Sequence, residues 1–146
     1  MNLGKAVKKV GAKGYSAGST FGTGVLNFLV AVSEYESRPT DWTDLKEKGG
    51  YCRKAYCLLE NDKYRWEKED LFRDIIRSEK NDKYAYYHSY DNEENTLCET
   101  ALVYTADMLD HGKMMSEIAD GLNLKPKTIM VICRFFNELE DEDDNQ

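Results

Sequence analysis

The chain has 146 residues, of which 20 are Lys or Arg and 27 are Asp or Glu, so its formal net charge is −7. This length allows one domain whose core needs no disulfide or metal ion. No apolar run approaches the roughly 20 residues that a membrane-spanning helix requires, so we expect no contact with a membrane. The acidity also disfavours a non-specific coat on nucleic acid, which needs Lys and Arg to neutralise phosphates.

Residues 1–24 are predicted to form a flexible basic arm. They contain Lys5, Lys8, Lys9 and Lys13, no acid, and six of the ten glycines, which lose much backbone entropy when ordered. The lysines and the apolar run from Val25 to Val32 imitate an export signal. A Gly/Ser/Thr-rich stretch separates the two parts, however, and no clear cleavage site follows. We therefore expect a cytoplasmic protein.

Residues 25–94 are predicted to form a helical core that packs or mediates oligomerisation. Apolar residues return at steps of three and four positions, which is typical of amphipathic helices. Breaks are expected at Ser37-Arg38-Pro39 and Asn61-Asp62, and a short helix is expected over Asp41–Lys48. The apolar stripes comprise Val25, Phe28, Leu29 and Val32, then Tyr51, Ala55, Leu58 and Leu59, and then Trp66, Leu71, Phe72, Ile75 and Ile76.

A tyrosine cluster ends this region and offers a candidate partner-binding surface at Tyr86, Tyr87 and Tyr90. Tyrosine is enriched at interfaces because it joins a rigid apolar ring to a polar tip. A short strand or the rim of the core remains an alternative reading of the same residues.

The four cysteines, Cys52, Cys57, Cys98 and Cys133, are expected to be reduced thiols. Zinc is the alternative, with His88 and His111 as further ligands, but structural zinc sites normally show two tight ligand pairs and this chain has one loose pair. We predict no metal site and no cofactor. The chain also lacks a nucleophile elbow and a paired-histidine motif, so we expect no enzyme.

Residues 95–139 contain the most informative pattern. A helical stripe from Leu97 to Leu109 ends at His111-Gly112, and the segment Lys113–Arg134 follows. This segment resembles a helix-turn-helix of the Glu-Ile-Ala…Leu…Thr-Ile type found in LuxR-like regulators and region 4 of sigma factors. The resemblance implies a small, mainly α-helical fold with a C-terminal tri-helical module.

The side chains of this segment fit that arrangement. Ile118 and Leu122 lie four residues apart and are expected in the core, with the small Ala119 at the helix crossing. Asn123 suits a left-handed turn, and Pro126 suits the first turn of a helix. Leu124, Ile129 and either Ile132 or Cys133 are expected to complete the buried side.

The resemblance places the start of the second helix against DNA. Carried onto this chain, the candidate nucleic-acid contacts are Lys113, Lys125, Lys127, Thr128 and Arg134. Met130 and Val131 stand where DNA readers tend to carry polar side chains, so they are candidates for partner binding or for packing against the molecule itself.

Two functions follow as hypotheses. The first is a DNA-associated regulatory protein that uses this helix and the basic arm on double-stranded DNA, as a monomer or a homodimer. The second is a non-enzymatic accessory or inhibitory factor that binds a nucleic-acid-processing protein, in one version as an acidic DNA mimic. The tail at 140–146, which contains five acidic residues, is expected to be disordered and would repel DNA.

Overall fold

The computed structural model describes residues 25–35, 50–80 and 92–139, and its regular structure in these ranges is entirely helical. The elements are α2 (Val25–Glu34), α4 (Gly50–Glu60), the 3-10 helix η2 (Asp62–Tyr64), α5 (Arg65–Lys80), α6 (Asn92–Asp110), α7 (Met115–Leu122) and α8 (Pro126–Glu138). The predicted mainly α-helical fold is therefore confirmed. Across these three ranges, no helix has the length and apolarity that crossing a bilayer would require.

Several sequence-based predictions concern residues outside these ranges. They are the arm at 1–24, the helix over Asp41–Lys48, the tyrosines Tyr86, Tyr87 and Tyr90, His88 as a zinc ligand, and the tail at 140–146.

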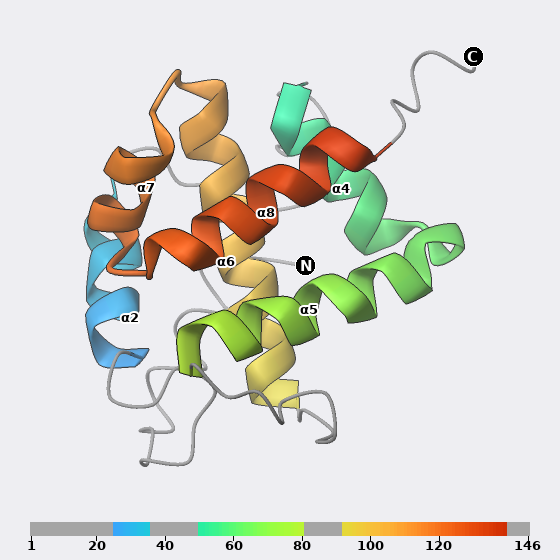
Figure 1. The fold of residues 1–146 in the computed structure, drawn as a ribbon, viewed down its shortest axis with the longest axis horizontal. Coiled ribbons are helices and arrows are strands. Elements are labelled where there is room, and N and C mark those ends of the chain that lie inside the picture. Colours follow the sequence, from blue (N-terminus) through green and yellow to red (C-terminus); the bar gives the residue numbers. More distant parts are fainter. Residues whose placement is uncertain (1–24, 36–49, 81–91, 140–146) are drawn as a thin grey trace.

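The helices are arranged around α6. In Figure 1, α8 crosses in front of α6, and α5 runs antiparallel to α8 and packs along it. Helix α4 packs against α6, and α2 packs against α7 at the opposite end of the long axis. Helices from the first part of the chain, α2, α4 and α5, therefore pack against helices from the last part, α6, α7 and α8.

One hydrophobic core extends through all of these helices, from Phe28 in α2 to Phe136 in α8. Phe28, Val32, Phe72 and Ile75 are fully buried, as the apolar spacing predicts. Because segments 25–94 and 95–139 share this core, the division proposed between them does not correspond to a gap between two separately packed units.

Trp66 departs from its predicted place in the buried stripe of α5, since 68% of its surface is exposed. Leu71 and Phe72 form that stripe and are buried. Residues in an α-helix turn by about 100° each, so Trp66 points about 140° away from Leu71, five positions later. The expectation was wrong because the apolar character of Trp66 does not place it in the stripe, whereas its angle around the helix places it on the exposed side.

The connection between α7 and α8 has the local geometry expected from its residues. Asn123 adopts the left-handed conformation, with φ 54° and ψ 40°. Leu124 N donates to Ala119 O over 3.1 Å, which satisfies a carbonyl group at the end of α7. Ile118, Leu122 and Ile129 are fully buried, and Pro126 opens α8, so these sequence-based predictions are confirmed.

Candidate nucleic-acid interface

Helix α8 has one exposed side, which carries Lys127, Met130, Arg134, Asn137 and Glu138. At 3.6 residues per turn, these five side chains leave the helix within an arc of about 100°. Lys125, the exposed N-cap residue, precedes them. From Lys125 to Glu138 the sequence contains three basic residues and one acid, Glu138 at the end of the helix. In a chain of net charge −7, this helix therefore still presents net positive charge to solvent.

A carboxylate from α5 occupies the amino end of α8. Glu79 Oε2 accepts a hydrogen bond of 2.8 Å from Lys125 N and a second one from the hydroxyl group of Thr128. An anion at this position stabilises the helix, because unpaired N–H groups and the helix dipole make the amino end positive. Glu79 thus sits where a phosphate would otherwise meet the backbone of α8. The cationic side chains of α8 are therefore the candidates for contact with a phosphate.

The same contact corrects one predicted site residue. Thr128 is 0% exposed, and its Oγ1 lies 3.2 Å from Ser78 Oγ in addition to its bond to Glu79. A hydroxyl group that is buried between α5 and α8 cannot reach a phosphate or a base. The expectation that Thr128 contacts DNA is therefore wrong for this conformation.

The carboxyl end of α8 is held by α4. Lys54 Nζ donates to Phe136 O over 3.1 Å, which places a positive charge at the negative end of the helix dipole. The rings of Tyr51 and Phe136 are 5.5 Å apart beside this contact. With Glu79 at one end and Lys54 at the other, α8 is fixed as a rigid element whose exposed side has a defined orientation.

The two residues predicted to bind a partner or pack internally behave differently. Met130 is 48% exposed and lies on the basic side of α8. Val131 and Phe135 are partly buried and pack against the molecule's own core. The side of α8 that carries Val131 and Phe135 thus packs against the protein's own core, and Met130 remains on the surface.

Lys113 is exposed but lies in different surroundings. It lines a pocket of about 470 Å³ together with Glu34 of α2 and with Glu117 and Asp120 of α7. No residue of α8 lines this pocket. The structure therefore groups Lys125, Lys127 and Arg134 on or beside one helix and places Lys113 among acidic side chains.

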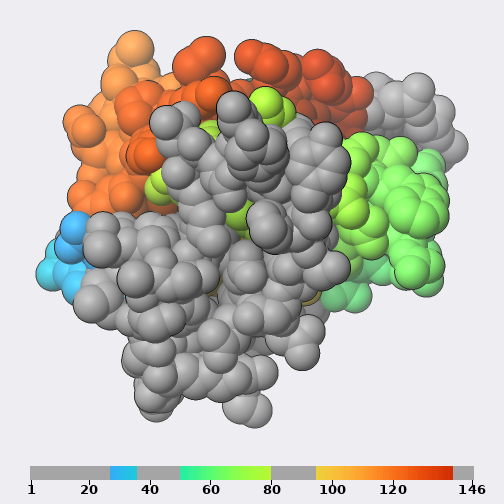
Figure 2. Space-filling view, turned by 60° about the horizontal axis from the view of Figure 1, so that its bottom comes forward, coloured from blue at the N-terminus to red at the C-terminus, as the bar shows by residue number. Residues whose placement is uncertain are grey.

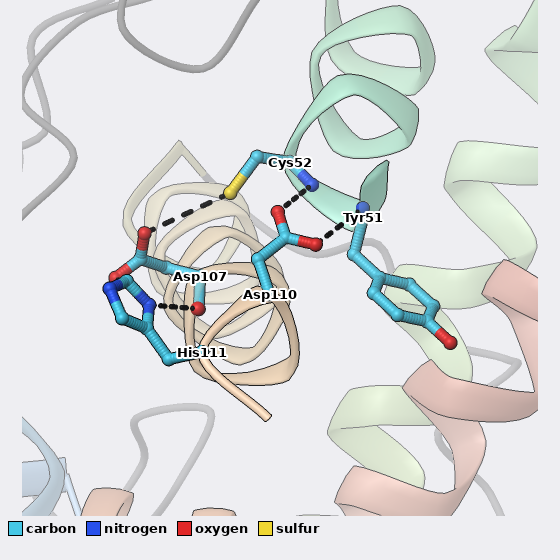
Figure 3. A network of polar contacts seen from close by, with 5 residues as sticks. All are labelled: Tyr51, Cys52, Asp107, Asp110 and His111. Carbon is cyan, nitrogen blue, oxygen red and sulfur yellow. Dashed lines mark hydrogen bonds and ion pairs between the residues drawn. The ribbon is translucent and has the colours of Figure 1, made fainter. Parts of the chain in front are cut away.

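A second polar cluster joins the end of α6 to the start of α4 (Figure 3). The side chain of Asp107 is 0% exposed, and its Oδ1 lies 3.9 Å from Cys52 Sγ. His111 Nδ1 lies 2.7 Å from the backbone oxygen of Asp107 and 3.7 Å from its Oδ2. The hydroxyl group of Tyr35 bonds to the same carboxylate, and burial together with this negative charge raises the pKa of Tyr35.

Asp110 caps α4 from the last turn of α6. Its two carboxylate oxygens accept hydrogen bonds of 2.8 Å from Tyr51 N and 2.9 Å from Cys52 N. Gly50 makes this approach possible, because a Cβ atom there would lie 2.5 Å from Asp110 Oδ1. The positive φ of 55° at Gly50 also favours glycine.

These contacts tie helices together and assemble no recognisable reaction centre. Cys52 is buried beside Asp107. Burial raises the pKa of Cys133, which disfavours the thiolate form that nucleophilic chemistry requires. In the parts of the chain that the structure describes, no three His, Cys, Asp or Glu side chains are placed to share a metal ion.

Sequence reasoning missed Glu79, Asp107, Asp110 and Asn137. The sequence offers a signal for Asp107, which interrupts the apolar run of α6 three positions after Tyr104 and therefore lies on its buried side. Asn137 can be found by extending the exposed side of α8 by one step from Arg134. Glu79 has no such signal, because its contacts with α8 join residues 46 and 49 positions apart.

No family model, no curated protein and no solved structure matches this chain.

Proposed function

We propose that this chain is a DNA-associated regulatory protein in which the exposed side of α8 lies against duplex DNA. The observation that carries the proposal is the positive surface of α8 in an acidic chain, where Lys125, Lys127 and Arg134 outnumber the one acid of the helix, Glu138. Lys125, Lys127 and Arg134 contact backbone phosphates, and each neutralised phosphate releases condensed counterions. The lysines of the arm at 1–24 add further phosphate contacts.

We expect the proposed contact to discriminate only weakly between DNA sequences. Met130, at the centre of the exposed side, offers no hydrogen bond to a base edge, although it can touch a thymine methyl group. Asn137 is the one uncharged polar side chain on this side that can pair with adenine, and it lies near the end of the helix. We therefore expect affinity to depend mainly on charge, with a modest preference among sequences.

The test is fluorescence anisotropy of a labelled mixed-sequence duplex at low salt. Lys127→Glu reverses a charge on the proposed surface, and Lys63→Glu reverses the charge of another exposed lysine on η2, at the other end of the molecule. The proposal predicts a large loss of affinity for the first variant and little change for the second. Equal losses, or no binding by the wild-type chain, would contradict it. Light scattering after size-exclusion chromatography then distinguishes a monomer from a homodimer.

A second candidate function is a protein-binding accessory or inhibitory factor that uses the same surface. It is favoured by three exposed methionines on and beside α7 and α8, Met114, Met115 and Met130. Methionine side chains are flexible and polarisable, and they suit surfaces that adapt to a partner. If duplex DNA does not bind at low salt, these exposed methionines become the stronger guide to function.

A further inference from the structure

A pocket of about 430 Å³ lies where α4 ends and α5 begins, lined by side chains of α4, η2 and α5. Figure 1 shows this connection at the end of the molecule opposite α2 and α7. Figure 2 shows the same separation, with the green segment at the right edge and α2 at the left. The pocket is therefore separate from the start of α8, where Lys125 and Lys127 lie.

An exposed aromatic ring is the main feature of the pocket. Trp66 lines it and keeps 68% of its surface in contact with solvent. The guanidinium carbon of Arg65 lies over the Trp66 ring, 5.5 Å from the ring centre. An exposed aromatic ring with a cation close to it suits a planar aromatic ligand that carries negative charge.

The other polar groups of the pocket fit the same kind of ligand. Asn61 Oδ1 accepts a hydrogen bond from Lys63 N, so its amide N–H groups are the donors it can offer a ligand. Asp62 adds a carboxylate acceptor, and a donor next to an acceptor matches the edge of a nucleobase. Lys68 adds a second cation and also interacts with the carboxyl group of Glu99. Arg65 is therefore the cation that we expect to contact the ligand.

We propose that this pocket binds a nucleotide, with the base stacked on Trp66 and the phosphate beside Arg65. The ligand is either a free nucleotide or an unpaired nucleotide of a nucleic-acid strand, since the base and the phosphate are common to both. The pocket volume falls in the range of small-molecule sites, about 300–1,000 Å³. This site goes beyond the duplex surface of α8 and uses none of its residues.

The experiment uses Trp66 as its own reporter. The chain has two tryptophans, and Trp42→Phe leaves Trp66 as the only one. In this background, emission is followed while adenosine 5′-monophosphate, a short oligothymidylate or inorganic phosphate is added. We expect saturable quenching by the nucleotide or the oligonucleotide and none by phosphate alone, because stacking requires a base. Quenching by the monophosphate indicates a free nucleotide, and quenching by the oligonucleotide alone indicates a strand.

Variants separate this site from the surface of α8. Arg65→Ala is expected to weaken binding at least about fivefold. Trp66→Ala removes the fluorescent reporter, so its binding is measured by calorimetry, and we expect it to be weakened by at least the same factor. Arg77→Ala, the same change at an exposed position of α5, is the matched control and should have no effect. Lys125→Gln/Lys127→Gln should leave this binding intact even if duplex binding is lost.

Three results would overturn the proposal. The first is the absence of saturable quenching by both base-containing ligands at millimolar concentration. The second is equal affinity in the Arg65→Ala and Arg77→Ala variants. The third is tighter binding of an oligoglutamate peptide than of either ligand, which would identify the pocket as a site for an acidic protein segment.

Discussion

Removal of the Glu79 side chain tests how α8 is held. In Glu79→Ala, Lys125 N loses a charge-assisted hydrogen bond, and Thr128 keeps only Ser78 Oγ, 3.2 Å away, as a partner. A lost helix cap costs about 0.5–2 kcal/mol, and a hydrogen bond to a charged group contributes about 1.5–3 kcal/mol. Because Glu79 is partly exposed, we expect the free energy of unfolding to fall by about 1–2 kcal/mol.

Urea unfolding measures this change, with Glu69→Ala as the matched control. Glu69 lies on the same helix, is partly exposed, and forms an ion pair of 3.9 Å with Arg73, so its loss should cost less than about 0.5 kcal/mol. Glu79→Gln also removes a negative charge beside Lys125, and we expect it to strengthen duplex binding. Equal stability of the Glu79→Ala and Glu69→Ala variants would refute the assigned role of Glu79.

Three further predictions address the fold and the surface. Gly50→Ala should lower the free energy of unfolding in urea by at least about 1 kcal/mol, because Gly50 has positive φ and its new Cβ would strike Asp110; an unchanged midpoint would contradict this. Burial raises the pKa of Glu99, so stability falls as the pH rises through that pKa; Glu99→Gln should raise the melting temperature at neutral pH and have little effect below about pH 4, whereas a pH-independent effect would refute the linkage. Met130→Arg should tighten duplex binding and increase the magnitude of its salt slope by about 0.9, and an unchanged slope would place Met130 away from DNA.

The α7–α8 connection could be predicted from sequence because its determinants are local. Asn123 tolerates the left-handed conformation, Pro126 fits the first turn of a helix, and the apolar spacing of Ile118 and Ile129 fixes their buried sides. Each of these properties depends on residues within a few positions. The structure confirms all of them.

The surroundings of the candidate contacts could not be predicted in the same way. Thr128 looks exposed from its place at the start of a helix, yet α5 covers it with Ser78 and Glu79. From the sequence, Lys113 is a candidate for contact with DNA, but in the structure it lines a pocket together with Glu34 of α2. Both outcomes depend on how distant helices pack, and the hydrophobic periodicity of one segment does not specify its neighbours.

The salt dependence of duplex binding tests the role of α8 most directly. The logarithm of the association constant is plotted against the logarithm of salt concentration for the wild-type chain and for Lys125→Gln/Lys127→Gln. Each phosphate contact contributes about −0.9 to the slope, so the loss of two contacts should reduce its magnitude by about 1.8, whatever the arm contributes. Equal slopes for the two proteins, or no binding at low salt, would contradict the proposal that α8 lies against DNA.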